Sequence, residues 1–158
     1  MGITFHPDGR VTGGTIKSSG NIVQVKQAEN SSQIASSSGD FDIVSVTLTP
    51  TATGNKIFIF GCVMGIQAGG YNNIRFKVTV KRDSTSLMVS DANHWIHGST
   101  LTMRDGGFSI NYVDTAPGTG TYTYKLVGSW TDTSGSNAFV NKDNNSGSTT
   151  ITVMEVAS

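Results

Sequence analysis

The sequence predicts an all-β protein, an antiparallel β-sandwich or jelly roll that carries an extended N-terminal arm. Three observations support this fold class. Thr, Ser and Gly are abundant and suit strands and turns, while charged residues make up only 14% of the chain. No stretch has the periodicity of an amphipathic helix, whereas about nine or ten stretches alternate as strands do. Their regular spacing is typical of a sandwich rather than an open sheet.

Length and charge limit the organisation and the partners. A chain of 158 residues fits one folded head, expected at residues 22–158, preceded by an arm at residues 1–21. Lys and Arg number 11, as do Asp and Glu, so the chain lacks the basic surface of a nucleic-acid-binding protein. No apolar run is long enough for a membrane helix, and we expect no membrane insertion. The N-terminus does not have the pattern of a signal peptide, so we expect synthesis and folding in a cytosol.

The arm has few apolar side chains with which to fold alone. They are Ile3, Phe5, Val11 and Ile16. Ordering each residue costs about 1–2 kcal/mol of backbone entropy, which four apolar side chains cannot offset. We therefore expect these four residues to be held by neighbouring proteins in an assembly.

The stretch from residue 107 to 130 predicts two strands joined by a turn at Pro117 and Gly118. Alternation gives each strand one apolar face, and we expect the two to pair as an antiparallel hairpin with Trp130 in the core. Further strands are expected at residues 22–25, 43–49, 56–66, 74–81, 87–89, 139–140 and 149–156. We expect the strand at 139–140 to lie at an edge and the Ser-rich segment 30–40 to be a loop, and residues 95–103 stay ambiguous.

The strand at residues 56–66 is apolar on both faces and so needs cover on both. One face can meet the opposite sheet and the other a second subunit. We expect a homotrimer with this strand, or its sheet, near the three-fold axis. The lone cysteine, Cys62, cannot form an internal disulfide, and we expect it to be buried and inert beside Phe60 and Met64.

The sequence offers no set of catalytic or cofactor-binding residues. On a strand, His94 and His97 would point to opposite faces, so we expect no metal site. Asp40 and Asp42 are best explained as a solvated start of a strand. Because no serine nucleophile motif and no phosphate-binding glycine loop occurs, we predict a protein that is not an enzyme and binds no cofactor.

Loop aromatic residues are the candidates for binding. Tyr71 and Asn72 lie in a predicted loop, and Trp95 lies in the ambiguous stretch. These three could contact a receptor or a glycan. The alternative function from the residues alone is a lectin-like carbohydrate-binding module that uses Tyr71 or Trp95 as a stacking platform.

Four segments resemble tail-fibre and related virion proteins of tailed bacteriophages, especially cyanophage-like marine ones. They are GITFHPDGRVTGGTI, VSVTLTPTATGNKIFIFGCV, DTAPGTGTYTYKL and STTITVMEVAS, and the closing pattern at residues 149–155 is the most specific. The resemblance implies trimeric jelly-roll heads similar in shape to C1q and tumour necrosis factor. It also implies a non-enzymatic virion protein that is assembled in the host cytoplasm, with other virion proteins and a host surface receptor as partners. Only about 20 residues precede the head, which favours a short tail fibre, a tip or a decoration protein over a long fibre.

Overall fold

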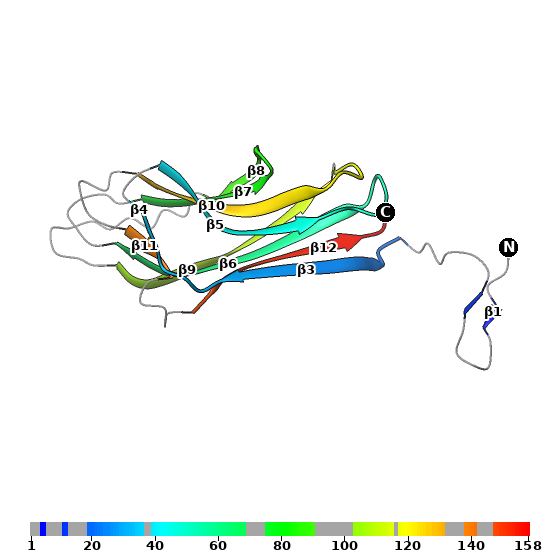
Figure 1. Ribbon diagram of the computed structural model, residues 1–158, viewed down its shortest axis with the longest axis horizontal. Coiled ribbons are helices and arrows are strands. Elements are labelled where there is room, and N and C mark those ends of the chain that lie inside the picture. Colours follow the sequence, from blue (N-terminus) through cyan, green and yellow to red (C-terminus); the bar gives the residue numbers. More distant parts are fainter. Residues whose placement is uncertain are drawn as a thin grey trace.

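The computed structural model describes residues 4–5, 11–12, 19–36, 39–68, 75–90, 103–115, 117–131, 138–141 and 147–158. All regular secondary structure in these residues is β-strand, which confirms the predicted fold class. Nothing in this part of the chain forms a helix long and apolar enough to cross a membrane. Figure 1 shows the two layers of the resulting sandwich, elongated along the strands.

Eight strands build the two main layers. One layer has the order β3-β12-β6-β9, and the other has the order β5-β10-β7-β8. The strands of the first layer are β3 (Ile22–Asn30), β12 (Thr149–Val156), β6 (Lys56–Ala68) and β9 (Met103–Asp114). Those of the second layer are β5 (Gly39–Leu48), β10 (Tyr122–Thr131), β7 (Arg75–Arg82) and β8 (Thr85–Ser90). All pairs are antiparallel, and most connections cross from one layer to the other, which is the arrangement of a jelly roll.

The core lies between the layers and follows the alternation that the sequence predicts. Phe76, Val78 and Val80 of β7 are at most 1% exposed, and they face the buried inner residues of the first layer. Trp130 is 4% exposed, and its ring centroid lies 4.4 Å from that of Phe76. The predicted core position of Trp130 is therefore confirmed, as are the inward faces of strands 43–49 and 56–66.

The predicted hairpin of residues 107–130 is wrong in its pairing. Both strands exist, but β9 pairs with β6, whereas β10 pairs with β5 and β7 in the other layer. The Pro117–Gly118 segment therefore crosses between layers instead of closing a hairpin. Alternation shows which face of a strand is buried, but it does not show which strand lies beside it.

Two smaller expectations are corrected as well. The segment expected to be a loop, residues 30–40, contains β4 (Ile34–Ser36) and the start of β5. Residues 139–140 lie in β11 (Ala138–Val140), which pairs with β4 on one side and with β6 on the other, so this strand is not an edge. Both strands are only three residues long, which is too short for alternation to reveal.

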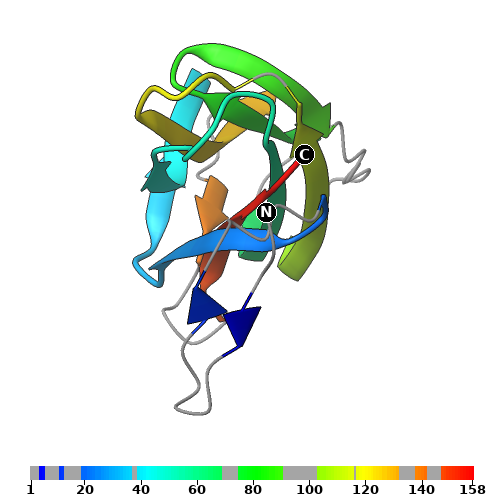
Figure 2. The ribbon, with the colours of Figure 1, turned by 90° about the vertical axis from the view of Figure 1, so that its right-hand side faces the viewer.

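Near the N-terminus, two short strands form a hairpin of their own. β1 (Thr4–Phe5) pairs with β2 (Val11–Thr12), and Phe5 lies opposite Val11. Figure 1 draws this hairpin apart from the sandwich, beyond the end at which the C-terminus lies, and Figure 2, viewed toward that end, draws it to one side of the strands.

Candidate assembly surface and arm root

The outer face of the β3-β12-β6-β9 layer carries an apolar surface. The ladder places Val25, Met154, Phe58 and Val113 side by side across the four strands. Directly opposed side chains in such ladders have Cβ atoms about 4.5–5.5 Å apart, so the row is continuous. Val25 is 53% exposed and Val113 is 36% exposed. We call this surface the apolar face, and its residues are Ile22, Val25, Phe58, Phe60, Val113 and Met154.

Phe60 and Cys62 continue the apolar face along β6. Phe60 is 42% exposed and lies between Thr152 of β12 and Asn111 of β9. Cys62 is a free, half-buried thiol. The expected burial of Cys62 is therefore corrected for the single chain, in which the thiol is only partly buried.

The outer face of the other layer is charged instead. Lys81 of β7 pairs with Asp40 of β5 at 3.1 Å, and Lys125 of β10 pairs with Asp42 at 2.9 Å. The hydrogen bond from Lys81 lowers the pKa of the Asp40 carboxyl. Both aspartates are more than half exposed, which confirms the interpretation of a solvated strand start. The sandwich thus has one apolar and one charged outer face.

A buried carboxylate lies near the start of β3, where the predicted arm ends. Glu155 of β12 is 0% exposed and points inward, opposite Gln24 of β3 and Ile57 of β6. Its Oε1 accepts hydrogen bonds from Asn55 Nδ2 at 2.6 Å, from Thr51 N at 2.7 Å and from Thr51 Oγ1 at 2.9 Å. Its Oε2 accepts a bond from Gln24 Nε2 at 2.6 Å. We call this cluster of four residues, Gln24, Thr51, Asn55 and Glu155, the arm root.

Sequence reasoning used Glu155 only as part of the closing pattern. The signal that could have singled it out is its register. Glu155 follows Thr149, Ile151 and Val153 at intervals of two, and all four positions are fully buried. A charged residue in register with an inward face must find internal partners, because an unsatisfied buried charge is strongly unfavourable.

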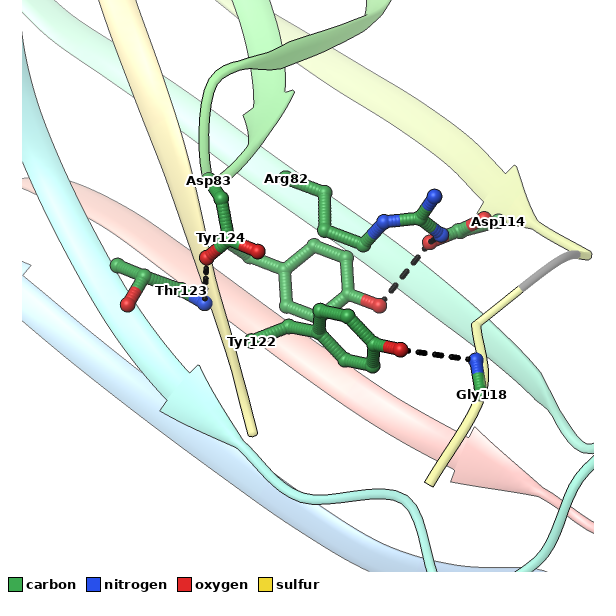
Figure 3. Close-up of polar contacts among 7 residues, drawn as sticks. All are labelled: Arg82, Asp83, Asp114, Gly118, Tyr122, Thr123 and Tyr124. Carbon is green, nitrogen blue, oxygen red and sulfur yellow. Dashed lines mark hydrogen bonds and ion pairs between the residues drawn. The ribbon is translucent and has the colours of Figure 1, made fainter. Parts of the chain in front are cut away.

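A second buried carboxylate lies on the same cross-strand row. Asp114 of β9 pairs with Ile57 from the other side and is 4% exposed. Its Oδ2 accepts bonds from Arg82 at 2.6 Å and from the Tyr124 hydroxyl at 3.0 Å, so this cluster links the two layers (Figure 3). Burial, together with the charge of Asp114, raises the pKa of Tyr124, so its hydroxyl stays a donor at neutral pH.

The same cluster holds the connection between β9 and β10. Gly118 N donates to the Tyr122 hydroxyl at 3.0 Å, and the Arg82 guanidinium lies 5.3 Å from the centre of the Tyr122 ring (Figure 3). Asp83 caps the start of β10 by accepting a bond from Thr123 N at 2.9 Å. These contacts hold in place the crossing that the sequence suggested as a hairpin turn.

Most of the binding residues predicted from sequence lie outside the described residues. This is so for Ile3, Ile16, Tyr71, Asn72 and Trp95, and also for His94 and His97. Phe5 and Val11 are brought together as partners in the β1-β2 hairpin. In the described ranges no group of three or more His, Cys, Asp or Glu residues could hold a metal ion.

No protein-family model and no curated protein sequence matches the chain. Among solved structures, the chain is similar to VP2 of infectious bursal disease virus in its subviral particle, at 14% identity and a TM-score of 0.49, over 100% of this chain and 42% of that chain. A structure of the Gx strain of the same virus matches at 15% identity and a TM-score of 0.48, with the same coverage. Derived T=1 particles match at 14% identity and 0.48, over 100% and 41%. The chain spans about two fifths of the length of the viral chains it matches.

Proposed function

We propose that the chain is a non-enzymatic structural protein of a bacteriophage virion, as a short tail fibre or a tip or decoration protein, and that it acts as a homotrimer. The sequence resemblance supports the virion assignment, and the jelly-roll connectivity agrees with the heads that the resemblance implies. The observation that carries the proposal is the apolar face, because it gives the head a surface suited to assembly.

The apolar face explains why copies of the chain would associate. Exposed apolar surfaces rimmed by polar residues mark interaction sites in otherwise soluble domains. Four strands contribute to the surface, and Val25 and Phe60 are 53% and 42% exposed in the single chain. The opposite outer face holds ion pairs such as Lys125–Asp42, which can stay hydrated. A closed ring of copies would bury the first face and leave the second in water.

The arm would attach this trimer to other virion proteins. Ile3, Phe5, Val11 and Ile16 would supply the apolar contacts, and an extended segment can also add to an open sheet edge of a neighbour. Tyr71, Asn72 and Trp95 would be displayed on loops and contact a host surface receptor or a glycan. The protein would then be located in the virion, after assembly in the host cytoplasm.

A charge placed in the apolar face tests the trimer. Phe60→Asp should weaken self-association by roughly tenfold or more, because a buried interface aspartate would have no cationic partner. Val89→Asp is the matched control, since Val89 is 51% exposed on β8 in the other layer. Native mass spectrometry of the wild-type chain and both variants at micromolar concentration reports the oligomeric state. A wild-type monomer, or a trimer that tolerates Phe60→Asp, would contradict the proposal.

Location and binding need separate measurements. Labelled antibodies against the head should mark purified phage particles in electron micrographs, and their absence from particles would contradict the virion assignment. Tyr71→Ala and Trp95→Ala variants, tested for binding to a glycan array, distinguish the proposed virion protein from the alternative, a lectin-like carbohydrate-binding module. Glycan binding that these variants abolish, in a chain that never enters particles, would favour the lectin-like module.

A further inference from the structure

We propose that Glu155 is a positioning residue for the arm: its hydrogen bonds fix the point at which the arm leaves the head, and their loss opens that end of the sandwich while the rest stays folded. The importance of this point rests on the attachment role proposed above. The local opening itself can be measured on the isolated chain, so the two ideas can fail independently.

Two separate segments donate hydrogen bonds to the one carboxylate, which itself belongs to β12. Gln24 belongs to the start of β3, directly after the arm, while Thr51 and Asn55 belong to the turn between β5 and β6. All four bonds to Glu155 are at most 2.9 Å long, and they use both of its oxygens. Asn55 also accepts a bond from Ser158 N at 3.3 Å, so the C-terminal residue is tied to the same cluster.

The ladder between β3 and β12 is irregular at this position. Gln24 pairs with Glu155, but Val156 pairs with Ile22, so Val23 is left out as a bulge. Beyond the bulge, Gly20 N donates to Ala157 O at 2.8 Å, and Ala157 N donates to Asn21 O at 2.9 Å. The side-chain hydrogen bond from Gln24 to Glu155 therefore joins β3 and β12 beside the bulge, close to where the arm begins.

Hydrogen bonds from neutral groups stabilise the ionised carboxylate of Glu155. On the far side of Ile57, Arg82 pairs with the other buried carboxylate, Asp114. Lys26 on β3 and Lys56 on β6 are exposed. Burial alone would raise the pKa of Glu155, but the bonds from Asn55, Gln24 and Thr51 outweigh it and lower the pKa below the ordinary value of 4.5. The carboxylate is ionised at neutral pH, and this ionised form makes the bonds.

Glu155→Gln tests the inference with little change in size. A glutamine presents one N–H₂ group, which must face either Gln24 Nε2 or the donors of Thr51 and Asn55, so at least one donor meets a donor. Two buried donors that face each other lower the free energy needed to open this end of the sandwich. Amide hydrogen exchange at Gly20, Thr51 and Ala157 should therefore accelerate about tenfold or more. Exchange at Val78 and Leu126, in the other layer, should stay near the wild-type rate.

Thr149→Val is the control on the same strand. Thr149 is fully buried at the opposite end of β12, where its Oγ1 donates to Asn141 Oδ1 at 2.8 Å and accepts from Met64 N at 3.3 Å. This variant should accelerate exchange near Asn141 and leave Gly20 unchanged. Uniform acceleration by Glu155→Gln across both layers, or no acceleration at Gly20 and Ala157, would overturn the proposal.

A reciprocal exchange keeps the test decisive if Glu155→Gln does not fold. In the double variant Gln24→Glu with Glu155→Gln, the amide of residue 155 can donate to the carboxylate at residue 24. The bond that Gln24 Nε2 donates to Thr49 O at 2.8 Å is lost, so folding and protection at Gly20 should return only in part. No recovery would count against the donor–acceptor pair as the cause. Incorporation of the Glu155→Gln variant into particles is measured separately. Normal incorporation despite local opening would contradict the attachment role of the arm, but not the structural role of the arm root.

Discussion

At the scale of single residues, Gly128 shows how closely the second layer is packed. A Cβ at this position would lie 2.6 Å from Phe41 Cζ and 3.1 Å from Ile43 Cδ1, both on the neighbouring strand β5. The bulge in the β5-β10 ladder brings these side chains inward, since Ile43 falls between the partners of Leu126 and Val127. A glycine is therefore required by space rather than by backbone conformation.

We expect Gly128→Ala to destabilise the head by about 1–3 kcal/mol, because overpacking a well-filled core forces side chains off their preferred rotamers. The shift of the urea midpoint at constant slope measures the loss. Gly120→Ala is the control, since its Cβ would lie 3.4 Å or more from the Tyr122 ring, which is ordinary contact. An equal loss of unfolding free energy in both variants would mean that Phe41 moves away from residue 128 without destabilising the head.

Glu155 predicts how stability depends on acid. Its pKa is lowered in the folded chain, so between the folded and unfolded pKa values the unfolded state binds more protons. Stability from this group is therefore fully present above about pH 4.5 and falls as the pH drops through the folded pKa. Melting temperatures between pH 7 and pH 3 should show this loss in the wild type and a flatter profile in Glu155→Gln. Parallel profiles would show that Glu155 does not contribute the slope.

At the scale of elements, the sequence predicted faces well and neighbours poorly. Phe76, Val78 and Val80 of β7 are buried, as expected of a long strand that repeats its apolar residues at every second position. The partner of β9 was missed because strand pairing depends on segments far apart in the sequence. Alternation within β9 cannot show that β6 lies beside it. The arm root was missed for a related reason: Gln24 and Thr51 meet Glu155 only after β3, β12 and the β5-β6 turn have come together.

The outer side of β6 leads to a prediction for Cys62. If copies of the chain cover the apolar face, this half-buried thiol should react slowly with an aromatic disulfide reagent in the assembled wild type. Dissociation by Phe60→Asp should speed the reaction by roughly tenfold or more, since reaction requires access to the thiolate. The Val89→Asp variant should react at the wild-type rate. Fast reaction in the wild-type assembly would show that Cys62 lies outside the interface.

At the scale of the whole molecule, the head and the arm have different requirements. The buried core cluster begins at Ile43, and Ala28 of β3 packs against it. In the described part of the chain, a backbone bond from Gly20 N to Ala157 O ties residues 19–20 to the sandwich. We expect deletion of residues 1–20 to leave a head that melts at nearly the same temperature but no longer joins particles. Calorimetry and particle incorporation measure the two effects. A truncated chain that fails to fold would mean that the arm belongs to the core.

The hydrogen bonds between Gly20, Asn21 and Ala157 have a practical consequence for labelling. They place the last residues of the chain beside the exit of the arm, as both ribbon views show. A fluorescent protein or purification tag fused after Ser158 would therefore stand next to the segment that must dock, and it could block docking without disturbing the fold.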